Sequence, residues 1–211
     1  MPVGHAAREL IEKHPIIVFW FDGPMLKGRL VGLREERRTD VEALFELDAD
    51  VELFSLTSAR PFQPRTLASW QAEYDKRQAE QNPKTTFFTI QRLDDEAREA
   101  LGSVGLWQID LHNRSAHIGI SLLPSVQGKG FGRDALDVIC RFGFDVRGLE
   151  RLSLETLETN GAMRAVAVAC GFVEEGRLRS AAWYLGRRVD EVVYGLLADE
   201  WRAHQRPSDG G

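Results

Sequence analysis

The sequence predicts an α/β fold in which a mixed sheet is flanked by helices. Strand-like runs of β-branched and aromatic residues recur along the chain, and apolar segments with helical spacing separate the later ones. A glycine-rich turn at Gly128–Gly132 joins one such strand directly to a helix. At 211 residues, of which 43% are hydrophobic, the chain is long enough to bury the core of one compact domain.

The domain is expected to occupy residues 26–205. Before it lies an N-terminal extension, residues 1–25, in which Ile16–Phe21 favours an extended segment that ends at a turn. The polar residues 206–211 are expected to form a disordered tail. No linker rich in proline, glycine or serine divides the chain, which favours one domain over two.

Helices are expected in the N-terminal part of the domain. Thr39 or Asp40 is placed to cap a helix that continues to Leu47, and Thr66 to cap a longer one. The segment 50–64 between them contains two prolines and is expected to be irregular. Segments of this kind often line a binding site in a compact domain.

The rest of the chain alternates strands and helices. The apolar residues of the strand expected at His117–Leu123 are nearly continuous, which predicts that this strand is buried on both faces of the sheet. Helices are expected at 134–146 and 160–169, the second ending at a glycine. The expected strands are Thr85–Ile90, Leu101–Ile109, His117–Leu123, Leu152–Thr156, Leu178–Leu185 and Glu191–Leu197.

Charge and composition argue against several classes of function. The net charge of −5 alternates in sign along the chain without a basic stripe, so nucleic-acid binding has no support. The apolar run near the start is far shorter than the roughly 20 residues of a membrane-spanning helix, and no secretory signal precedes it. We therefore expect a cytoplasmic protein that does not insert into a membrane.

The cysteines and histidines suggest neither a disulfide framework nor a metal site. Cys140 and Cys170 both lie among apolar residues of helical segments, as buried reduced thiols do. The five histidines are dispersed without the spacing of metal ligands. We expect a chemistry that needs no metal.

The segment that points to chemistry covers residues 121–133, where a strand enters a glycine-rich turn that opens a helix. Glycines permit positive φ and let an anion approach the main chain closely. The first turn of a helix adds unpaired N–H groups and the positive end of the helix dipole. The segment therefore predicts a binding site for a phosphate or pyrophosphate group, although the same glycines also suit a simple tight turn.

Two well-known phosphate loops do not fit this segment. The nucleotide-triphosphate loop needs a Ser or Thr after its Lys, whereas Lys129 is followed by Gly130. The dinucleotide fingerprint needs a small residue where Arg133 stands. Neither an NTPase nor a nicotinamide-dependent dehydrogenase is supported.

The sequence Gln127-Gly128-Lys129-Gly130-Phe131-Gly132 resembles the Q/R-x-x-G-x-G/A acetyl-CoA-binding signature of the GNAT acetyltransferase superfamily. The similarity extends over about residues 26–202 and is strongest to the branch that acetylates the N-terminal serine or alanine of ribosomal proteins. It implies a mixed, mostly antiparallel sheet that is splayed at the acetyl-CoA site. It also implies acetyl-CoA as acyl donor and a primary amine as acceptor.

The resemblance implies a role for each residue around the cofactor. The main chain of Ile120 and Leu122 would pair with the pantetheine arm where the strand leaves its neighbour. Asn160 would hydrogen-bond the pantetheine or lie beside the thioester, although an Asn at a helix start is usually a cap. Amide groups around the pyrophosphate would come from Gln127, Gly128, Lys129, Gly130, Phe131, Gly132 and Arg133.

Direct acetyl transfer needs a base, an oxyanion donor and an acid. His117 stands where some members carry a glutamate base, and histidine titrates close to neutral pH; a packed strand histidine is the alternative. The N–H of Leu122 is the candidate oxyanion donor. The usual tyrosine acid is replaced by Ala167, so Tyr184, Cys170 or solvent would protonate the departing thiolate.

The acceptor is expected to lie beside the segment 50–64, where Asp48, Asp50 and Glu52 are candidates to attract an amine. The sequence leaves open whether the acceptor is a small molecule or a protein N-terminus. An alternative is a non-catalytic module that binds or sequesters acyl-CoA, which Ala167 motivates. The extension at residues 2–24 suggests an arm for a homodimer.

Overall fold

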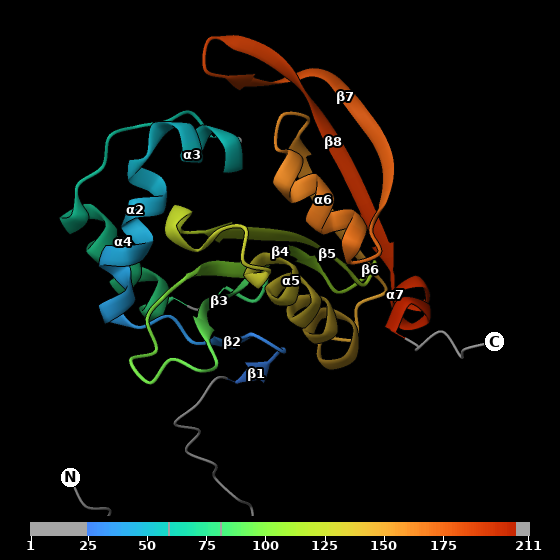
Figure 1. Cartoon of the computed structure of the whole chain (residues 1–211), viewed down its shortest axis with the longest axis horizontal. Helices are drawn as coiled ribbons and strands as arrows, with labels where there is room; N and C mark the ends of the chain where they lie inside the picture. The colour runs from blue at the N-terminus through green and yellow to red at the C-terminus, as the bar shows by residue number, and fades with distance from the viewer. Residues whose placement is uncertain (1–24, 59, 81, 206–211) are drawn as a thin grey trace, which may run out of the picture.

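The computed structural model describes residues 25–58, 60–80 and 82–205. It shows one eight-stranded sheet with helices packed against both faces (Figure 1). The strands are β1 (Leu26–Lys27), β2 (Val31–Arg34), β3 (Thr86–Arg92), β4 (Gly102–Asp110), β5 (Ser115–Leu122), β6 (Arg151–Leu157), β7 (Val173–Tyr184) and β8 (Arg187–Leu197). The helices are α2 (Val41–Ala49), α3 (Val51–Thr57), α4 (Leu67–Ala79), α5 (Phe131–Arg141), α6 (Gly161–Ala169) and α7 (Ala198–Gln205), with short turns η1 (Arg38–Asp40), η2 (Pro124–Val126) and η3 (Phe142–Val146).

The strand order is β1-β2-β3-β4-β5-β6-β8-β7. Every neighbouring pair is antiparallel except β5 and β6, which run parallel. The predicted mixed, mostly antiparallel sheet flanked by helices is therefore confirmed. Because the only parallel pair lies in the middle of the sheet, the chain must cross over there, and α5 forms that crossover.

β5 and β6 pair over only three positions, from Ser115↔Arg151 to His117↔Ser153. β5 nevertheless remains paired with β4 as far as Gly102↔Leu122. Beyond His117, the edge of β5 that faces β6 is therefore open. We refer to this open edge, residues 118–122, as the β5–β6 opening.

Strand alternation settles which residues face the β5–β6 opening. The carbonyl of Arg114 accepts a hydrogen bond from the start of β6, whereas the N–H of Leu123 donates to Leu101 at the β4 side. Backbone groups of successive strand residues point to opposite edges, so even-numbered residues of β5 turn toward β6. The N–H and C=O groups of Ile120 and Leu122 therefore face the opening.

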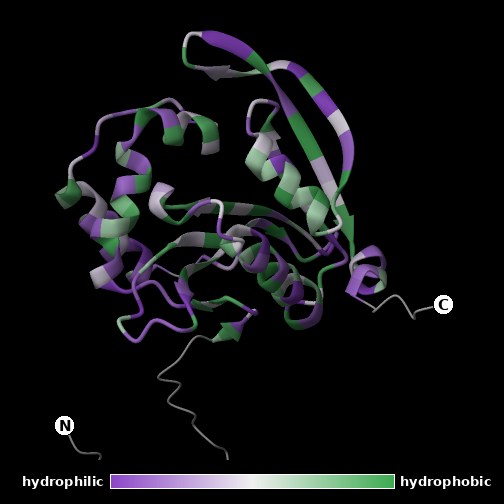
Figure 2. Ribbon diagram, viewed as in Figure 1, coloured by the Kyte–Doolittle hydropathy of each residue, from purple (hydrophilic) through white to green (hydrophobic). Residues whose placement is uncertain are grey.

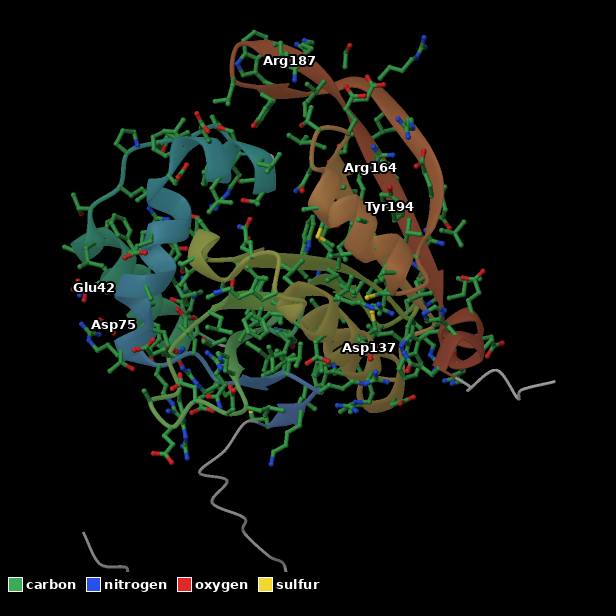
Figure 3. All side chains as sticks on the ribbon, viewed as in Figure 1. Glu42, Asp75, Asp137, Arg164, Arg187 and Tyr194 are labelled. Atoms are coloured by element: carbon green, nitrogen blue, oxygen red, sulfur yellow. The ribbon has the colours of Figure 1, made fainter. Side chains whose placement is uncertain are left out.

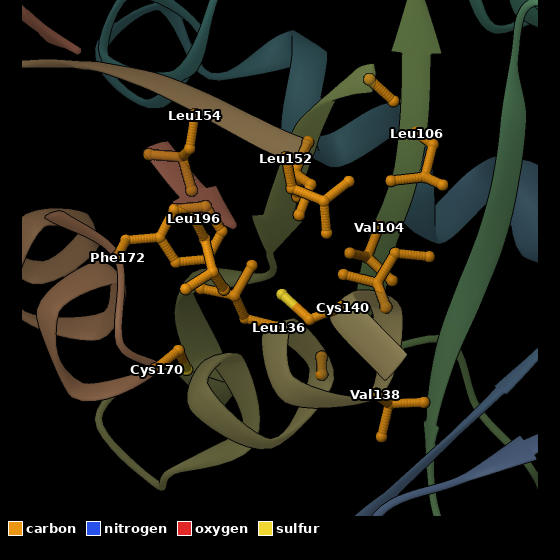
Figure 4. Close-up of a cluster of buried hydrophobic side chains, with 14 of the residues drawn as sticks. Val104, Leu106, Leu136, Val138, Cys140, Leu152, Leu154, Cys170, Phe172 and Leu196 are labelled. Atoms are coloured by element: carbon orange, nitrogen blue, oxygen red, sulfur yellow. The ribbon is translucent and has the colours of Figure 1, made fainter. Parts of the chain in front are cut away.

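The main core lies between α5, α6 and one face of the sheet. α5 buries its apolar side against even-numbered residues of β4, β5 and β6, among them Val104, Ile118 and Leu152. Figure 4 shows Val104 and Leu152 among the buried side chains of this core, and Figure 2 shows α6 and the adjoining part of β8 as largely apolar. The odd-numbered residues therefore face the side of the sheet where α2 packs against β4.

Two of the expected segments were wrong. Part of the segment expected to be irregular forms α3, because the Asp50 carboxylate accepts the N–H groups of Glu52 and Leu53 at 2.9 Å and starts a helix. The strand at 117–123 is not buried on both faces: Ile120 and Leu122 are partly exposed, because β6 has diverged beside them. The expected strand at 16–21 lies outside the described residues, as does the expected tail.

A buried ion pair fixes the start of the helical layer to the sheet. Arg34 of β2 holds Asp40 through Nη1 at 2.6 Å and Nη2 at 2.8 Å, and their side chains are 1% and 5% exposed. The remaining donors of Arg34 bond Gln91 of β3 and two backbone carbonyls. Asp40 therefore does not cap α2 as expected, since its carboxylate is occupied by the guanidinium.

Replacing Asp40 by asparagine should lower the free energy of unfolding by about 3–5 kcal/mol, because Arg34 stays buried without its counter-charge. Urea unfolding followed by circular dichroism measures the change. Arg38→Ala serves as the control, since it removes an exposed pair with Asp75 and should cost less than about 1 kcal/mol. Equal losses of unfolding free energy in the two variants would contradict the role of the Arg34–Asp40 ion pair as a buried anchor.

Candidate active site

The loop between β5 and α5 has the backbone that its glycines permit. We call residues 127–133 the glycine loop. Gly128 and Gly130 have φ angles of +74° and +84°, a region that residues with a Cβ atom rarely adopt. A Cβ atom on Gly132 would lie 3.3 Å from the side chain of Leu122. The first two glycines are thus favoured by their conformation, whereas a Cβ atom at the third would need Leu122 to shift by a few tenths of an ångström.

The glycine loop presents a row of backbone donors. The N–H of Gln127 is taken by Pro124 O at 3.3 Å, and that of Asp134 by Gly130 O at 3.2 Å. Between these two, no N–H from Gly128 to Arg133 donates to another residue in the described part of the chain. Unpaired donors at a helix start, together with the helix dipole, make a site for an anion such as a pyrophosphate.

Two side chains of the glycine loop brace it from within. Gln127 Nε2 donates to the carbonyl of Leu122 at 3.0 Å, and Lys129 Nζ donates to Ser125 O at 3.0 Å. The Gln127 amide therefore supports the end of β5, whereas its own N–H is occupied. Arg133 is exposed on the first turn of α5, where its guanidinium is free to meet a phosphate.

Asp134 is a site residue that the sequence did not identify. Its carboxylate accepts the N–H groups of Arg29, Leu30 and Val31 at 2.8–3.0 Å, which ties α5 to the turn between β1 and β2. A Cβ atom on Gly28 would lie 2.3 Å from this carboxylate, so the turn needs a glycine there. Its position directly after a candidate anion-binding loop was the sequence signal that could have identified it. A carboxylate there would repel the anion unless other groups of the protein bind it.

Asn160 lies after β6, on the other side of the β5–β6 opening from Ile120 and Leu122. Its Oδ1 accepts the N–H of Met163 at 3.1 Å and so caps α6. The ordinary capping role is thus present. The side-chain NH2 group makes no hydrogen bond to any residue that the structure describes, so it remains available to a ligand.

His117 occupies the last position at which β5 and β6 pair. Its Nδ1 lies 3.0 Å from Glu155 Oε2, and its ring packs on Trp107 with centroids 4.8 Å apart. The side chain remains 31% exposed. His117 is therefore a half-buried histidine held by a carboxylate at the point where the β5–β6 opening begins. Nearby, burial raises the pKa of Glu191, and the charge of Glu155 raises it further.

The candidates for the general acid are widely separated. Tyr184 forms the last pair of the β7–β8 hairpin with Arg187, which Figure 3 places at the far tip. Ala167, which replaces the usual tyrosine, is a residue of α6 and is fully buried. Burial raises the pKa of Cys170 to about 12. Because a free thiol has a pKa near 8.5, Cys170 is too weak an acid to protonate a leaving thiolate.

A cavity lies on the odd-numbered face of the sheet. It has a volume of about 300 Å³ and is lined by Ser103 and Ser121 of the strands and by residues of α2, α3 and α4. Ser121 stands between the two residues whose backbone faces the β5–β6 opening. The cavity therefore reaches the end of β5 on the odd-numbered face of the sheet, beside the opening at its edge.

Of the three acidic candidates, only Asp48 lines this cavity. Burial raises its pKa, and the charges of Arg60 and Arg65 partly offset this. Asp50 instead caps α3, and Glu52 is exposed outside the cavity. Asp48 is therefore the candidate to receive a cationic group.

The described residues contain no group of three His, Cys, Asp or Glu side chains arranged to hold a metal ion. None of their helices is long and apolar enough to cross a membrane.

Comparison with known proteins gives the family. Residues 30–173 match the family described as the acetyltransferase (GNAT) domain, and this is more than half of the chain. The chain belongs to this family, so the resemblance inferred from the glycine loop is confirmed. The acyl donor of GNAT acetyltransferases is acetyl-CoA.

Two curated relatives differ in the acceptor their names give. The chain is 32% identical over 104 residues to a putative ribosomal N-acetyltransferase, YdaF, of Bacillus subtilis, covering 49% of this chain and 57% of that protein. It is 29% identical over 109 residues to the spermidine N(1)-acetyltransferase of Vibrio cholerae, covering 52% and 63%. The chain thus spans about three fifths of the length of either relative.

Solved structures share the fold over most of the chain. A crystal structure of the Vibrio cholerae spermidine N-acetyltransferase with CoA and spermine superposes with a TM-score of 0.73 at 24% identity, covering 82% of this chain and 98% of that one. A structure of the same enzyme with manganese ions gives a TM-score of 0.68 at 24% identity, covering 84% and 98%. These likenesses confirm the predicted fold.

Both cysteines should be inert to a thiol reagent in the folded protein. Cys140 is fully buried and Cys170 is 3% exposed, and burial raises the pKa of each thiol. With Ellman's reagent at pH 8, we expect less than about one tenth of the thiols to react before unfolding and both to react in guanidinium. Fast reaction of the folded protein would show that the Cys170 thiolate is accessible.

Proposed function

We propose that the protein is an N-acetyltransferase that moves an acetyl group directly from acetyl-CoA to a primary amine. The observation that carries the proposal is the meeting of three features at the end of β5. These are the β5–β6 opening, the glycine loop with its unpaired N–H groups, and the cavity on the opposite face.

Acetyl-CoA would lie along β5. Its pyrophosphate accepts hydrogen bonds from the glycine loop, where the donors from Gly128 to Arg133 converge, and Arg133 pairs with a phosphate. The pantetheine arm takes the place of a strand between β5 and β6. There it bonds the backbone groups of Ile120 and Leu122, and the side-chain NH2 of Asn160 reaches it from the other side.

The N–H of Leu122 is the proposed oxyanion donor. It turns toward the β5–β6 opening, whereas the side chain of the preceding Ser121 turns toward the cavity. A thioester beside Leu122 therefore has a hydrogen-bond donor on one side and the incoming amine on the other. A fixed backbone donor stabilises the negative charge that develops on the carbonyl oxygen during attack.

His117 is the proposed base, and Glu155 positions it. With Nδ1 held by the carboxylate, Nε2 is free to accept a proton. His117 and Leu122 are five strand positions apart, which separates their Cα atoms by roughly 17 Å. The proton of the amine therefore reaches His117 through water rather than by direct contact. Solvent is the proposed proton donor to the leaving thiolate, since Cys170 is too weak an acid and Tyr184, the sequence candidate, pairs with Arg187 at the far tip of the β7–β8 hairpin.

We also propose a cytoplasmic homodimer. Two reduced buried cysteines suit a reducing compartment. The β7–β8 hairpin leaves one edge of β7 unpaired in the described sheet, with Leu178 and Trp183 exposed on it. Unprotected edges and exposed apolar side chains favour association. A monomeric mass by sedimentation velocity would contradict the dimer.

The second candidate is a non-catalytic module that binds or sequesters acyl-CoA. It is favoured by the fully buried Ala167 at the position of the usual tyrosine acid. A single amine that is acetylated in many turnovers removes this candidate.

Titration calorimetry should show acetyl-CoA binding that Gly130→Glu abolishes, because the substitution puts bulk and negative charge among the loop donors. Gly186→Glu is the matched control, since Gly186 also has a positive φ, +89°, and lies in the distant hairpin turn. Loss of binding in both variants would point to general disruption. If the unmodified protein does not bind acetyl-CoA, the proposal fails.

His117→Ala should lower kcat by about 10²–10⁴-fold while leaving the affinity for acetyl-CoA unchanged. Glu155→Gln should lower kcat less, because the imidazole stays in place but loses the carboxylate that orients it through Nδ1. The steady-state rate of CoA release checks both changes. If the kcat of His117→Ala stays within twofold of that of the unmodified enzyme, His117 is a packing residue and not the base.

A further inference from the structure

The cavity beside Ser121 continues into a second one, of about 400 Å³, toward the chain segment after α3. The two share four charged residues: Asp48, Arg60, Arg65 and Glu73. We call this continuous space the α2–α4 groove. Ser103 and Ser121 form its inner end at the sheet.

Most charges of the α2–α4 groove are already paired with one another. Arg65 bonds Glu73, and Arg77 bonds Glu36 at 2.9 Å and approaches Glu73 at 3.5 Å. Both guanidiniums also lie over the ring of Trp70, at 5.4 and 5.9 Å from its centroid. These side chains form a mutually neutralised wall that offers a ligand little net charge.

Two charged groups of the groove lack such a partner. Asp48 makes no hydrogen bond or ion pair with any residue that the structure describes, although burial raises its pKa. Arg60 pairs with no described carboxylate and lies over the ring of Phe54, 5.8 Å from its centroid. The groove therefore presents one available anion and one available cation, near enough for Arg60 to lower the pKa of Asp48.

This balance of charge argues against a polyamine as acceptor. Three carboxylates of the inner cavity, Glu36, Asp48 and Glu73, are matched there by three arginines. A ligand with several ammonium groups needs an excess of carboxylates, and the arginines repel it. A ligand with one ammonium and one anionic group meets both available charges.

The inner cavity also has an apolar part. Leu44 and Leu47 of α2, together with Phe87 of β3, line the inner cavity between the charged wall and the two serines. Phe87 is 51% exposed, so its ring is open to contact with a ligand. Such a surface suits a short apolar or aromatic side chain rather than a sugar ring.

We infer that the acceptor is a free α-amino acid with an apolar side chain, its ammonium held by Asp48 and its carboxylate by Arg60. The inference rests on the proposed acetyl transfer and names the acceptor of that reaction. The amine loses a proton and attacks the thioester carbon, a C–N bond forms and the C–S bond breaks. The products are the N-acetyl amino acid, CoA thiol and one released proton.

The test uses the full chain and three amines. L-Phenylalanine and L-phenylalaninamide share one aromatic ring, and spermidine is the ring-free polyamine control. CoA release at saturating acetyl-CoA gives kcat/KM for each. We expect L-phenylalanine to exceed both others by at least about tenfold, because only it supplies a carboxylate to Arg60.

Variants assign that preference to residues. Arg60→Met should bring L-phenylalanine and its amide to within about twofold of each other, chiefly by raising KM for the amino acid. Asp48→Asn should raise KM for both L-phenylalanine and L-phenylalaninamide by about tenfold. Arg179→Met, which changes an exposed arginine of β7 outside the groove, should leave the preference unchanged.

The outcomes separate the inference from the proposed function. Faster turnover of spermidine or of the amide, or an unchanged preference in Arg60→Met, overturns the amino-acid assignment while acetyl transfer stands. If no amine reacts and calorimetry shows no L-phenylalanine binding to the CoA complex, the assignment also fails. A protein that does not bind acetyl-CoA would lose the proposed function itself.

Discussion

The divergence of β5 from β6 is the constraint on which the rest of the site depends. β5 stays paired with β4 as far as Leu122, whereas its other edge loses its partner after His117. An unpaired strand edge inside a sheet must be satisfied by something else. Because α5 begins directly beyond that edge, the open backbone groups and the unpaired donors of the glycine loop follow one another along the chain, as the proposed CoA site requires.

The helical layer on the other face turns this arrangement into a two-sided site. Arg34 and Asp40 anchor the start of that layer to β2, and Gln91 extends the contact to β3. α2 is thereby held over the sheet, and Asp48 and Ser121 line the same cavity. The proposed sites for the acyl donor and the acceptor therefore adjoin at the end of β5 without sharing the same space.

The sequence predicted the fold class, the family and the glycine loop, because these depend on local patterns: strand periodicity, a strand-to-helix turn and glycines in required places. It missed α3, whose only local sign was a capping Asp50 before two prolines. It also misjudged Asp40, because its partner Arg34 is brought near only by the fold. Asp134 and the pairing of charges in the α2–α4 groove depend on contacts distant in sequence, which periodicity does not reveal.

Amide hydrogen exchange with and without CoA tests the central claim most directly. If CoA lies along β5, the amides of Ile120 and Leu122 and those of Gly128–Arg133 should exchange more slowly in its presence. The amides of Gly119 and Ser121, which already face β4, should change little. Protection confined to other segments, with these amides unaffected, would contradict binding in the β5–β6 opening.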